Sequence, residues 1–263
     1  MALSETDKVS DLEACLNSIA NQTFTNHEII IVSDGLVSGD LVDVVKKYQS
    51  QEHLALSFQQ IEKKSGPARA WNAGFDLAKG DYIARMDPDD IMRPERLETQ
   101  LQFMKAHPDI HVLGAWIQEF DKDSGDSHRL RKTPVCHEQI ARVSSFSNPM
   151  NHVTTMMQRD VTTRFKYEQF WGFVDYFFWL KILDAGLKFH NLDKVLVDVR
   201  VGNGFINRRR GWNYLKSEFA FLCACWQRQK LRRLDIIKYA ILKLPSRLLP
   251  HWVLERIYAL MRR

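Results

Sequence analysis

Apolar residues in the first half of the chain alternate between a helical period and short runs typical of buried strands. Apolar positions on one face predict helices over residues 11–20, 41–51, 67–78 and 94–106. Apolar or alternating runs between them predict strands over residues 28–32, 54–61 and 82–86. Because strands and helices alternate with short connections, we predict an α/β fold with a mostly parallel central sheet flanked by helices.

The second half of the chain is less regular. We expect a strand over 110–120, a loop over 122–131, an apolar helix over 173–185 and a strand over 195–201. From residue 215 the pattern is helical and is interrupted by two prolines. These patterns predict two parts, an α/β domain over residues 1–205 and a basic amphipathic helical extension over residues 206–263.

Positive charge is concentrated in the C-terminal extension. From residue 226 onward ten Lys or Arg face two acidic residues, a net charge of +8, whereas the whole chain carries +5. Apolar residues alternate with these cations, which predicts interfacial helices that bind an anionic membrane surface. A helical hairpin packed on the α/β domain is the alternative. A nucleic-acid-binding protein is a further one, but we expect no nucleic acid because no recognition motif is present.

Cysteine usage and the N-terminal pattern indicate the compartment. The four cysteines are few and far apart, which favours reduced thiols over a disulfide framework. The chain begins without the charged start and apolar stretch of a signal peptide, and its apolar runs are shorter than the roughly 18 residues of a membrane span. We therefore expect a cytoplasmic protein, peripheral on the inner face of the plasma membrane.

Carboxylates directly follow two of the predicted strands. Asp34 ends one strand, and Asp87, Asp89 and Asp90 follow another. Parallel α/β sheets bind ligands at the carboxyl ends of their strands, so both turns are candidate sites. Three carboxylates within four residues repel one another, and a divalent cation relieves that repulsion. Oxygen ligands suit Mg²⁺ or Mn²⁺. The alternative is a solvated acidic turn in which Asp90 caps the next helix.

Six groups of residues, from residue 12 to about 200, resemble the family 2 glycosyltransferases, the inverting group with the GT-A fold. In chain order they are Leu16-Asn17-Ser18-Ile19 with Gln22-Thr23; residues 28–32 with Asp34-Gly35; Gly66, Ala68-Arg69 and Asn72-Ala73-Gly74; Gly80-Asp81-Tyr82-Ile83 with Asp87-Pro88-Asp89-Asp90; Asn148-Pro149 with His152; and Asp175-Tyr176 with Trp179. The last two groups resemble a bacterial subset that makes surface polysaccharides and lipopolysaccharides.

The resemblance implies how a nucleotide-sugar donor is bound. Asp34 would contact the base, and Arg69 would lie near the nucleotide or the sugar. Asp87 and Asp89 would hold the donor and its Mn²⁺ or Mg²⁺, with Asp90 as a further metal ligand. A uridine diphosphate sugar is the expected donor.

The remaining candidates concern catalysis and the acceptor. The resemblance implies that Asp175 is the catalytic base. His152 and Trp179 are candidates for the acceptor side, with structural roles as the alternative. Arg209 and Arg210 belong to a basic run that could clamp a pyrophosphate, because guanidinium groups match phosphate oxygens. An exposed basic run without a ligand is the alternative.

The resemblance implies a metal-dependent, inverting transfer of sugar to a saccharide or lipid-linked acceptor. Two departures motivate an alternative, an impaired remnant that binds only nucleotide. Val174 stands where the family usually has Glu, and residues 1–4 stand where the family has a full first strand. We therefore expect a nearly absent first strand that leaves neighbouring strand edges unpaired.

Overall fold

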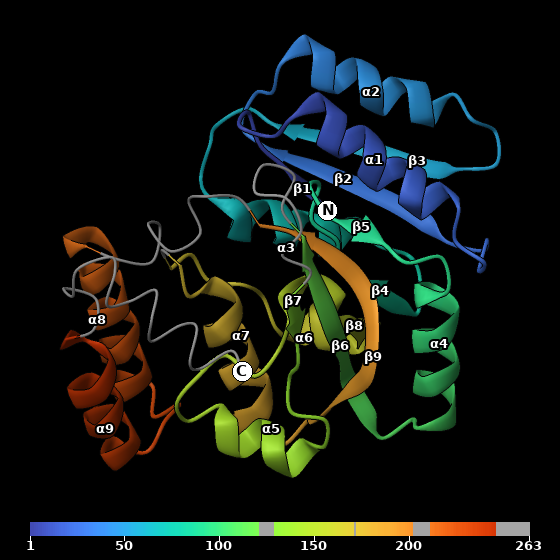
Figure 1. Ribbon diagram of the computed structural model, residues 1–263. Helices are drawn as coiled ribbons and strands as arrows, with labels where there is room; N and C mark the ends of the chain where they lie inside the picture. Colours follow the sequence, from blue (N-terminus) through green and yellow to red (C-terminus); the bar gives the residue numbers. More distant parts are fainter. Residues whose placement is uncertain (121–128, 171, 202–210, 246–263) are drawn as a thin grey trace.

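The computed structural model describes residues 1–120, 129–170, 172–201 and 211–245, and it has the predicted α/β architecture (Figure 1). The N-terminal sheet is wholly parallel, with the order β1-β2-β3. Its elements are β1 (Ala2–Leu3), α1 (Val9–Ala20), β2 (Glu28–Asp34), α2 (Gly39–Gln49), β3 (Ala55–Ile61) and α3 (Pro67–Leu77). The prediction of a parallel sheet is confirmed here, and each predicted helix or strand lies within two residues of its expected bounds.

The second sheet is mixed and follows the order β4-β8-β6-β9-β5, with β7 paired to β6. Its strands are β4 (Tyr82–Ala84), β5 (Ile91–Met92), β6 (Ile110–Phe120), β7 (Arg129–Arg131), β8 (Met156–Gln158) and β9 (Lys188–Arg200). Four of its five pairings are antiparallel, and only β6 and β9 are parallel. The predicted loop over 122–131 is wrong at Arg129–Arg131. Strands of two or three residues carry too little periodicity to be predicted.

Helices complete the fold. They are α4 (Arg96–Ala106), α5 (His137–Val143), α6 (Arg159–Arg164), α7 (Val174–Asp184), α8 (Trp212–Gln227) and α9 (Arg233–Lys243), with a 3₁₀ turn at His152–Thr154. Among the described residues, no helix is both long enough and apolar enough to cross a membrane.

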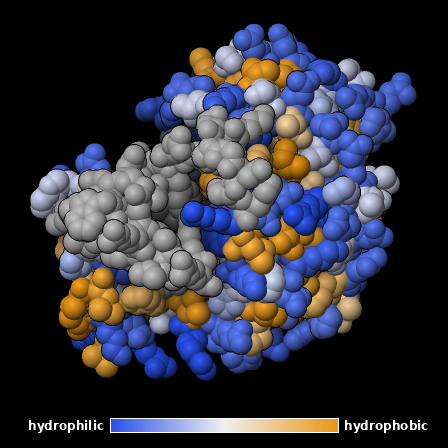
Figure 2. Space-filling model, in the orientation of Figure 1, coloured by the Kyte–Doolittle hydropathy of each residue, from blue (hydrophilic) through white to orange (hydrophobic). Residues whose placement is uncertain are grey.

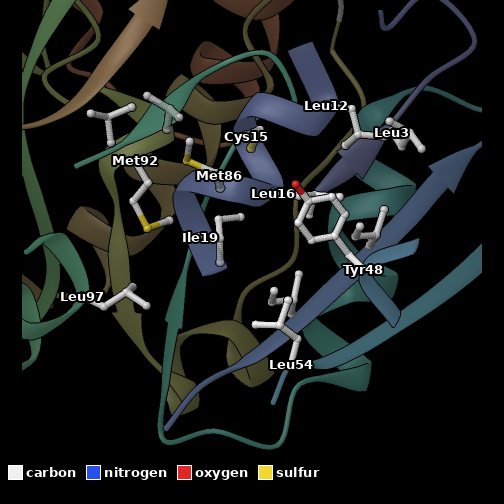
Figure 3. Close-up of a cluster of buried hydrophobic side chains, with 14 of the residues drawn as sticks. Leu3, Leu12, Cys15, Leu16, Ile19, Tyr48, Leu54, Met86, Met92 and Leu97 are labelled. Carbon is white, nitrogen blue, oxygen red and sulfur yellow. The ribbon is translucent and has the colours of Figure 1, made fainter. Parts of the chain in front are cut away.

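The largest buried cluster joins α1 and α2 to both sheets. Leu3, Leu12 and Leu16 are 0% exposed and lie together in it, with Met86 and Met92 from the second sheet's side (Figure 3). Leu3 belongs to β1, which pairs only with the C-terminal end of β2. The expectation of a nearly absent first strand is confirmed, because β1 has two residues.

Two further clusters pack the second half of the chain. One lies between α3, α6, α7 and the second sheet. The other joins α7 to α8 and α9 through Phe177, Phe221 and Tyr239, among others. The described part of the C-terminal extension therefore packs on the α/β domain as a helical hairpin (Figure 1). Residues 246–263 of the predicted extension lie outside the described residues.

Candidate functional site

The acidic turn follows β4 and is held in place by a buried arginine two residues before Asp87. Arg85 is 3% exposed, and its Nη2 donates to Asp87 Oδ1 at 2.8 Å. Its guanidinium lies 4.6 Å from the ring centroid of Trp71. Arg96, which is fully buried, donates from Nη2 to the carbonyl oxygen of Arg85 at 2.7 Å. These contacts fix the direction in which the chain leaves β4.

A second arginine holds the other end of the turn. Arg200, the last residue of β9, donates from its backbone N to Asp90 Oδ1 at 2.8 Å. Its Nε donates to the carbonyl oxygen of Asp89 at 3.1 Å, and its Nη2 lies 3.4 Å from Asp11 Oδ1. Asp90 and Asp11 are both buried. The turn is therefore held by Arg200 of β9, which is paired in turn with Asp11 of α1.

The three carboxyl groups of the turn differ in their surroundings. Asp89 is exposed, yet desolvation by the surrounding protein and the charge of Asp87 raise its pKa to about 6. Burial, with Asp87 and Asp89 as further causes, raises the pKa of Asp90 to about 9. Negative charge at this turn is thus costly without a compensating cation.

The donor set fits a divalent cation held by one or two carboxylates. Asp89 is open to solvent, and Asp87 is half-buried beside it in the chain, so both offer oxygen ligands at the surface. Asp90 fits less well, because it is 3% exposed and already accepts from Arg200. Within the described ranges, no cluster of three or more His, Cys, Asp or Glu side chains forms a complete protein cage. A cation here would therefore need further oxygen ligands, such as substrate phosphates.

A buried network leads from the acidic turn to Tyr167, whose ring stacks on Phe178 of α7 at 4.0 Å between centroids. Arg85 Nε lies 3.3 Å from His152 Nε2, which lies 2.8 Å from the hydroxyl of Tyr167. Burial, reinforced by the positive charge of Arg85, lowers the pKa of His152 well below its usual value, so the imidazole is neutral. Burial raises the pKa of Tyr167, and the charges of Asp175 and Asp87 add to the effect. The network therefore links the acidic turn to the segment that precedes α7.

Asp175 lies in the first turn of α7 and is oriented by an amide. Asn148 donates from Nδ2 to Asp175 Oδ2 at 2.6 Å. Asp175 is half-buried, whereas its neighbours Val174 and Tyr176 are buried. The carboxylate at the helix N-terminus is also favoured by the helix dipole. The Asn148 and Asp175 positions, which the sequence placed in two separate motifs, are in direct contact.

Asp34 and Arg69 lie at the N-terminal end of α3. Asp34 is 7% exposed, and its Oδ1 accepts from Ser65 N at 2.8 Å while its Oδ2 accepts from Gly66 N at 2.9 Å. The exposed Arg69 donates from Nη1 to Ser65 Oγ at 3.1 Å. The structure thus gives Asp34 a structural role in shaping this loop, while the Arg69 guanidinium remains at the surface.

Two of the predicted site positions need comment. Trp179, a candidate for the acceptor side, is 0% exposed, and its ring centroid lies 6.0 Å from that of Phe189, which favours its alternative, structural role. Its burial follows from its place on the core-facing side of the largely apolar α7. Arg209 and Arg210 lie outside the described residues.

The sequence analysis missed three residues of the site, Arg85, Arg200 and Tyr167. A signal existed for Arg85, because it is a cation directly after the short apolar strand that leads into the acidic turn. Arg200 ends a strand that contains several other charged residues, so it does not stand out in the sequence. Tyr167 carries no such signal. It reaches the site because Asn72 pairs with it, accepting from Tyr167 N at 2.8 Å and donating to Tyr167 O at 2.9 Å.

Comparisons with a family model and with known proteins all point to glycosyltransferases. The model of "Glycosyl transferase family 2" matches residues 7–176. The amylovoran biosynthesis glycosyltransferase AmsE of Erwinia amylovora is 34% identical over 262 residues, which cover 98% of this chain and 96% of that protein. The UDP-Gal:alpha-D-GlcNAc-diphosphoundecaprenol beta-1,3-galactosyltransferase of Escherichia coli is 31% identical over 251 residues, covering 95% and 90% respectively.

Solved structures with a similar fold share little sequence with this chain. The mannosyltransferase PcManGT of Pyrobaculum calidifontis, in complex with GDP-Man and Mn²⁺, superposes with a TM-score of 0.67 at 13% identity, covering 94% of this chain and 70% of that one. S. aureus TarS 1–349 in complex with UDP-GlcNAc superposes with a TM-score of 0.61 at 19% identity, covering 84% and 65%. At these identities the likeness shows the GT-A-like fold alone.

Proposed function

Because the chain belongs to glycosyl transferase family 2 and is therefore a glycosyltransferase, we propose that it transfers a sugar from a nucleotide diphosphate sugar, with a UDP-sugar as the expected donor. The acceptor is a saccharide or a lipid-linked saccharide in the synthesis of a cell-surface polysaccharide. Two relatives support this choice, since one is named for amylovoran biosynthesis and another for a UDP-Gal donor and a diphosphoundecaprenol-linked acceptor.

One observation carries the proposal, the braced acidic turn that leaves Asp89 exposed at the end of β4. Asp89, with Asp87 beside it, would hold Mn²⁺ or Mg²⁺ together with the donor diphosphate. When bound, such a cation neutralises the charge that develops on a departing nucleoside diphosphate. Asp90 remains buried and stabilises the turn by accepting a hydrogen bond from the backbone N of Arg200. Arg85 orients the Asp87 carboxylate through their ion pair.

Asp175 is the proposed catalytic base. It accepts the proton of the acceptor hydroxyl as that oxygen attacks the anomeric carbon, and a single displacement inverts this centre. Asn148 keeps one carboxylate oxygen in a fixed direction through its hydrogen bond of 2.6 Å. Val174 is buried, so its apolar side chain occupies a core position and leaves the proton-accepting role to Asp175 alone.

The donor also needs cationic contacts. Arg69 is the described candidate, because its guanidinium is exposed at the N-terminal end of α3, and guanidinium groups match phosphate oxygens. Arg209 and Arg210 remain predicted diphosphate contacts. The base contact of Asp34 remains a prediction as well, and the loop that Asp34 orders is a second way in which this residue can affect donor binding.

Calorimetric titration with UDP, with and without Mn²⁺, tests the donor site. We expect Mn²⁺-dependent binding that Asp89→Ala weakens at least about tenfold, because a charged metal ligand is lost. Asp81→Ala is the matched control, since Asp81 is an exposed aspartate at the opposite end of β4. The proposal would be contradicted if both variants lost the same UDP affinity, or if UDP bound equally well with and without Mn²⁺. Metal-dependent binding without transfer to any acceptor would instead favour the nucleotide-binding remnant.

We further propose that α8 and α9 contact an anionic membrane surface. Large apolar side chains are exposed along both helices: Trp212, Phe219, Trp226, Leu234, Ile237, Ile241 and Leu242. Figure 2 shows hydrophobic atoms gathered in this region, which lies at the lower left in the view of Figure 1. Exposed cations include Arg233 and Lys238 of α9, and Arg228 and Arg232 in the connection between the two helices. Apolar side chains flanked by cations are typical of interfacial helices.

Point substitutions test this surface better than deletion of α9. Deletion would expose the core, because Ile236 and Tyr239 are buried against α8 and α7. We expect the double variant Ile237→Ser, Ile241→Ser to bind anionic vesicles at least about fivefold more weakly in a sedimentation assay, because two apolar side chains no longer enter the interface. The exposed Leu36, which lies near α2, provides the control Leu36→Ser. Unchanged binding of the double variant would refute the proposal.

A further inference from the structure

One ring nitrogen of His152 contacts two side chains at once. His152 begins the 3₁₀ turn before β8, and its Nε2 lies 3.3 Å from Arg85 Nε and 2.8 Å from the hydroxyl of Tyr167. A guanidinium N–H donates and cannot accept, so Nε2 must be the acceptor and carries no proton. The proton of the neutral ring is therefore on Nδ1, and the Tyr167 hydroxyl is the second donor to Nε2.

The surroundings of His152 favour this neutral form. Burial lowers the pKa of His152 well below its usual value, and the positive charge of Arg85 lowers it further. A neutral imidazole whose acceptor nitrogen already has two protein partners has little to offer a phosphate group. These contacts favour a supporting role for His152 over direct contact with the donor or the acceptor.

Arg85 is held through its backbone and through its guanidinium. Its backbone N donates to Thr155 O at 2.8 Å. Its guanidinium lies over the ring of Trp71, and its Nη2 donates to Asp87 Oδ1. Because a guanidinium is planar and rigid, the direction of its Nε–H fixes the direction of Nη2. The acceptor nitrogen of His152 therefore contributes to the geometry of the ion pair between Arg85 and Asp87.

The second partner of His152, Tyr167, is fixed by the core. Asn72 of α3 forms hydrogen bonds with both the backbone N and the backbone O of Tyr167. The Tyr167 ring stacks on Phe75 of α3 and on Phe178 of α7, with centroid separations of 5.3 Å and 4.0 Å. Since its ring and backbone are both held, the hydroxyl donates to His152 from a defined position. The imidazole is thus oriented by contacts that do not involve the acidic turn.

We propose that His152 is a positioning residue of the donor site, which holds the Arg85 guanidinium so that the Asp87 carboxylate presents its second oxygen to the cation. The ion pair uses Asp87 Oδ1. A carboxylate that is fixed through one oxygen has a defined direction for the other, as for metal ligands oriented by their outer partners. His152 acts through Arg85 and contacts neither cation nor donor. This role rests on the proposed cation site at Asp87 and Asp89.

Four variants of the full chain test whether His152 acts through Arg85. His152→Leu removes the acceptor nitrogen, whereas His152→Gln supplies an amide oxygen that can accept in its place. Arg85→Met removes the guanidinium, and the double variant Arg85→Met, His152→Leu measures the coupling between the two residues. Calorimetry gives the Mn²⁺ affinity at saturating UDP and the UDP affinity without Mn²⁺. Urea unfolding identifies the variants that are folded at the titration temperature.

We expect His152→Leu to weaken Mn²⁺ binding about five- to tenfold, because losing a direct partner of a metal ligand costs about 10–100-fold and His152 lies one contact further out. His152→Gln should stay within about twofold of the wild type, because an acceptor is retained. UDP affinity without Mn²⁺ should not change. In the Arg85→Met background, the loss of His152 should weaken Mn²⁺ binding by less than about twofold.

Equal losses in His152→Leu and His152→Gln would overturn the proposal, as would the same fold-loss with and without Arg85. If the wild-type chain bound UDP equally well with and without Mn²⁺, the cation site itself would be refuted.

A spectroscopic measurement on the unaltered chain does not depend on the folding of any variant. The ¹⁵N chemical shifts of the His152 ring distinguish a proton on Nδ1 from one on Nε2, and the spectrum of His152→Gln identifies which resonances belong to His152. We expect Nδ1 to be protonated and Nε2 to be unprotonated at neutral pH. A protonated Nε2 would overturn the proposal, because that nitrogen could not accept from Arg85.

Discussion

Replacing Asp34 by alanine tests whether this residue acts through the loop that it orders. Asp34 is 7% exposed, and its two oxygens accept from the backbone N–H groups of Ser65 and Gly66 at 2.8 to 3.1 Å. Both amides lie immediately before α3, where a carboxylate also compensates the helix dipole. The substitution removes the acceptor for two donors at once.

The expected loss of stability follows from these contacts. A hydrogen bond to a charged group contributes about 1.5–3 kcal/mol. Ser65 is exposed, so water can replace part of its lost contact, whereas Gly66 is half-buried. We therefore expect Asp34→Ala to lower the free energy of unfolding by about 2–4 kcal/mol. For a chain of this size, that corresponds to a Tm lower by about 4–16 °C. Asp34→Asn retains one acceptor oxygen and should lose about half as much.

Urea unfolding and UDP titration of the same variants separate the two roles of Asp34. The control Asp43→Ala removes a carboxylate that is 76% exposed and only 3.9 Å from Lys46, a pair worth less than about 1 kcal/mol. If Asp34→Ala unfolded at the same urea concentration as Asp43→Ala but no longer bound UDP, the structural argument would fail. Asp34 would then act only through direct contact with the nucleotide.

Two further substitutions probe the sheet and the turn. Gly114→Ala would place a Cβ 2.0 Å from Asn191 Oδ1, so we expect a loss of about 1–3 kcal/mol in urea unfolding. Gly39→Ala, which meets nothing within 4 Å, should leave stability unchanged, and similar midpoints for both would contradict this packing. Arg200→Met removes the partner of the buried Asp11, so we expect a loss of about 2–4 kcal/mol and weaker UDP binding with Mn²⁺. A variant of Arg200 as stable as the wild type would show that the turn does not depend on this brace.

The N-terminal architecture could be predicted from the sequence because its signals are local. Helices α1 to α4 and strands β2, β3 and β6 each carry enough periodic apolar positions to be recognised. The acidic turn was also predictable, since Asp87, Asp89 and Asp90 follow an apolar strand directly. The motifs of the family, read in order along the chain, indicated the glycosyltransferase class.

The mixed second sheet could not be predicted from local sequence patterns. β5, β7 and β8 have two or three residues each, so their pairing partners are set by the register of β6 and β9. The strand predicted over 195–201 is only the end of β9, which begins at Lys188. Irregularities in the pairing of β6 and β9 also obscure the apolar alternation along β9.

The sequence by itself determined the family, the α/β class and the position of the carboxylates. Only the tertiary structure decided which carboxylate is open to a ligand, because burial by other segments separates Asp89 from Asp90. The tertiary structure also places Arg85 and Arg200 in contact with the acidic turn, and it buries Trp179. A local pattern specifies a residue's chemistry and its element, whereas exposure and partners depend on segments that are distant in the chain.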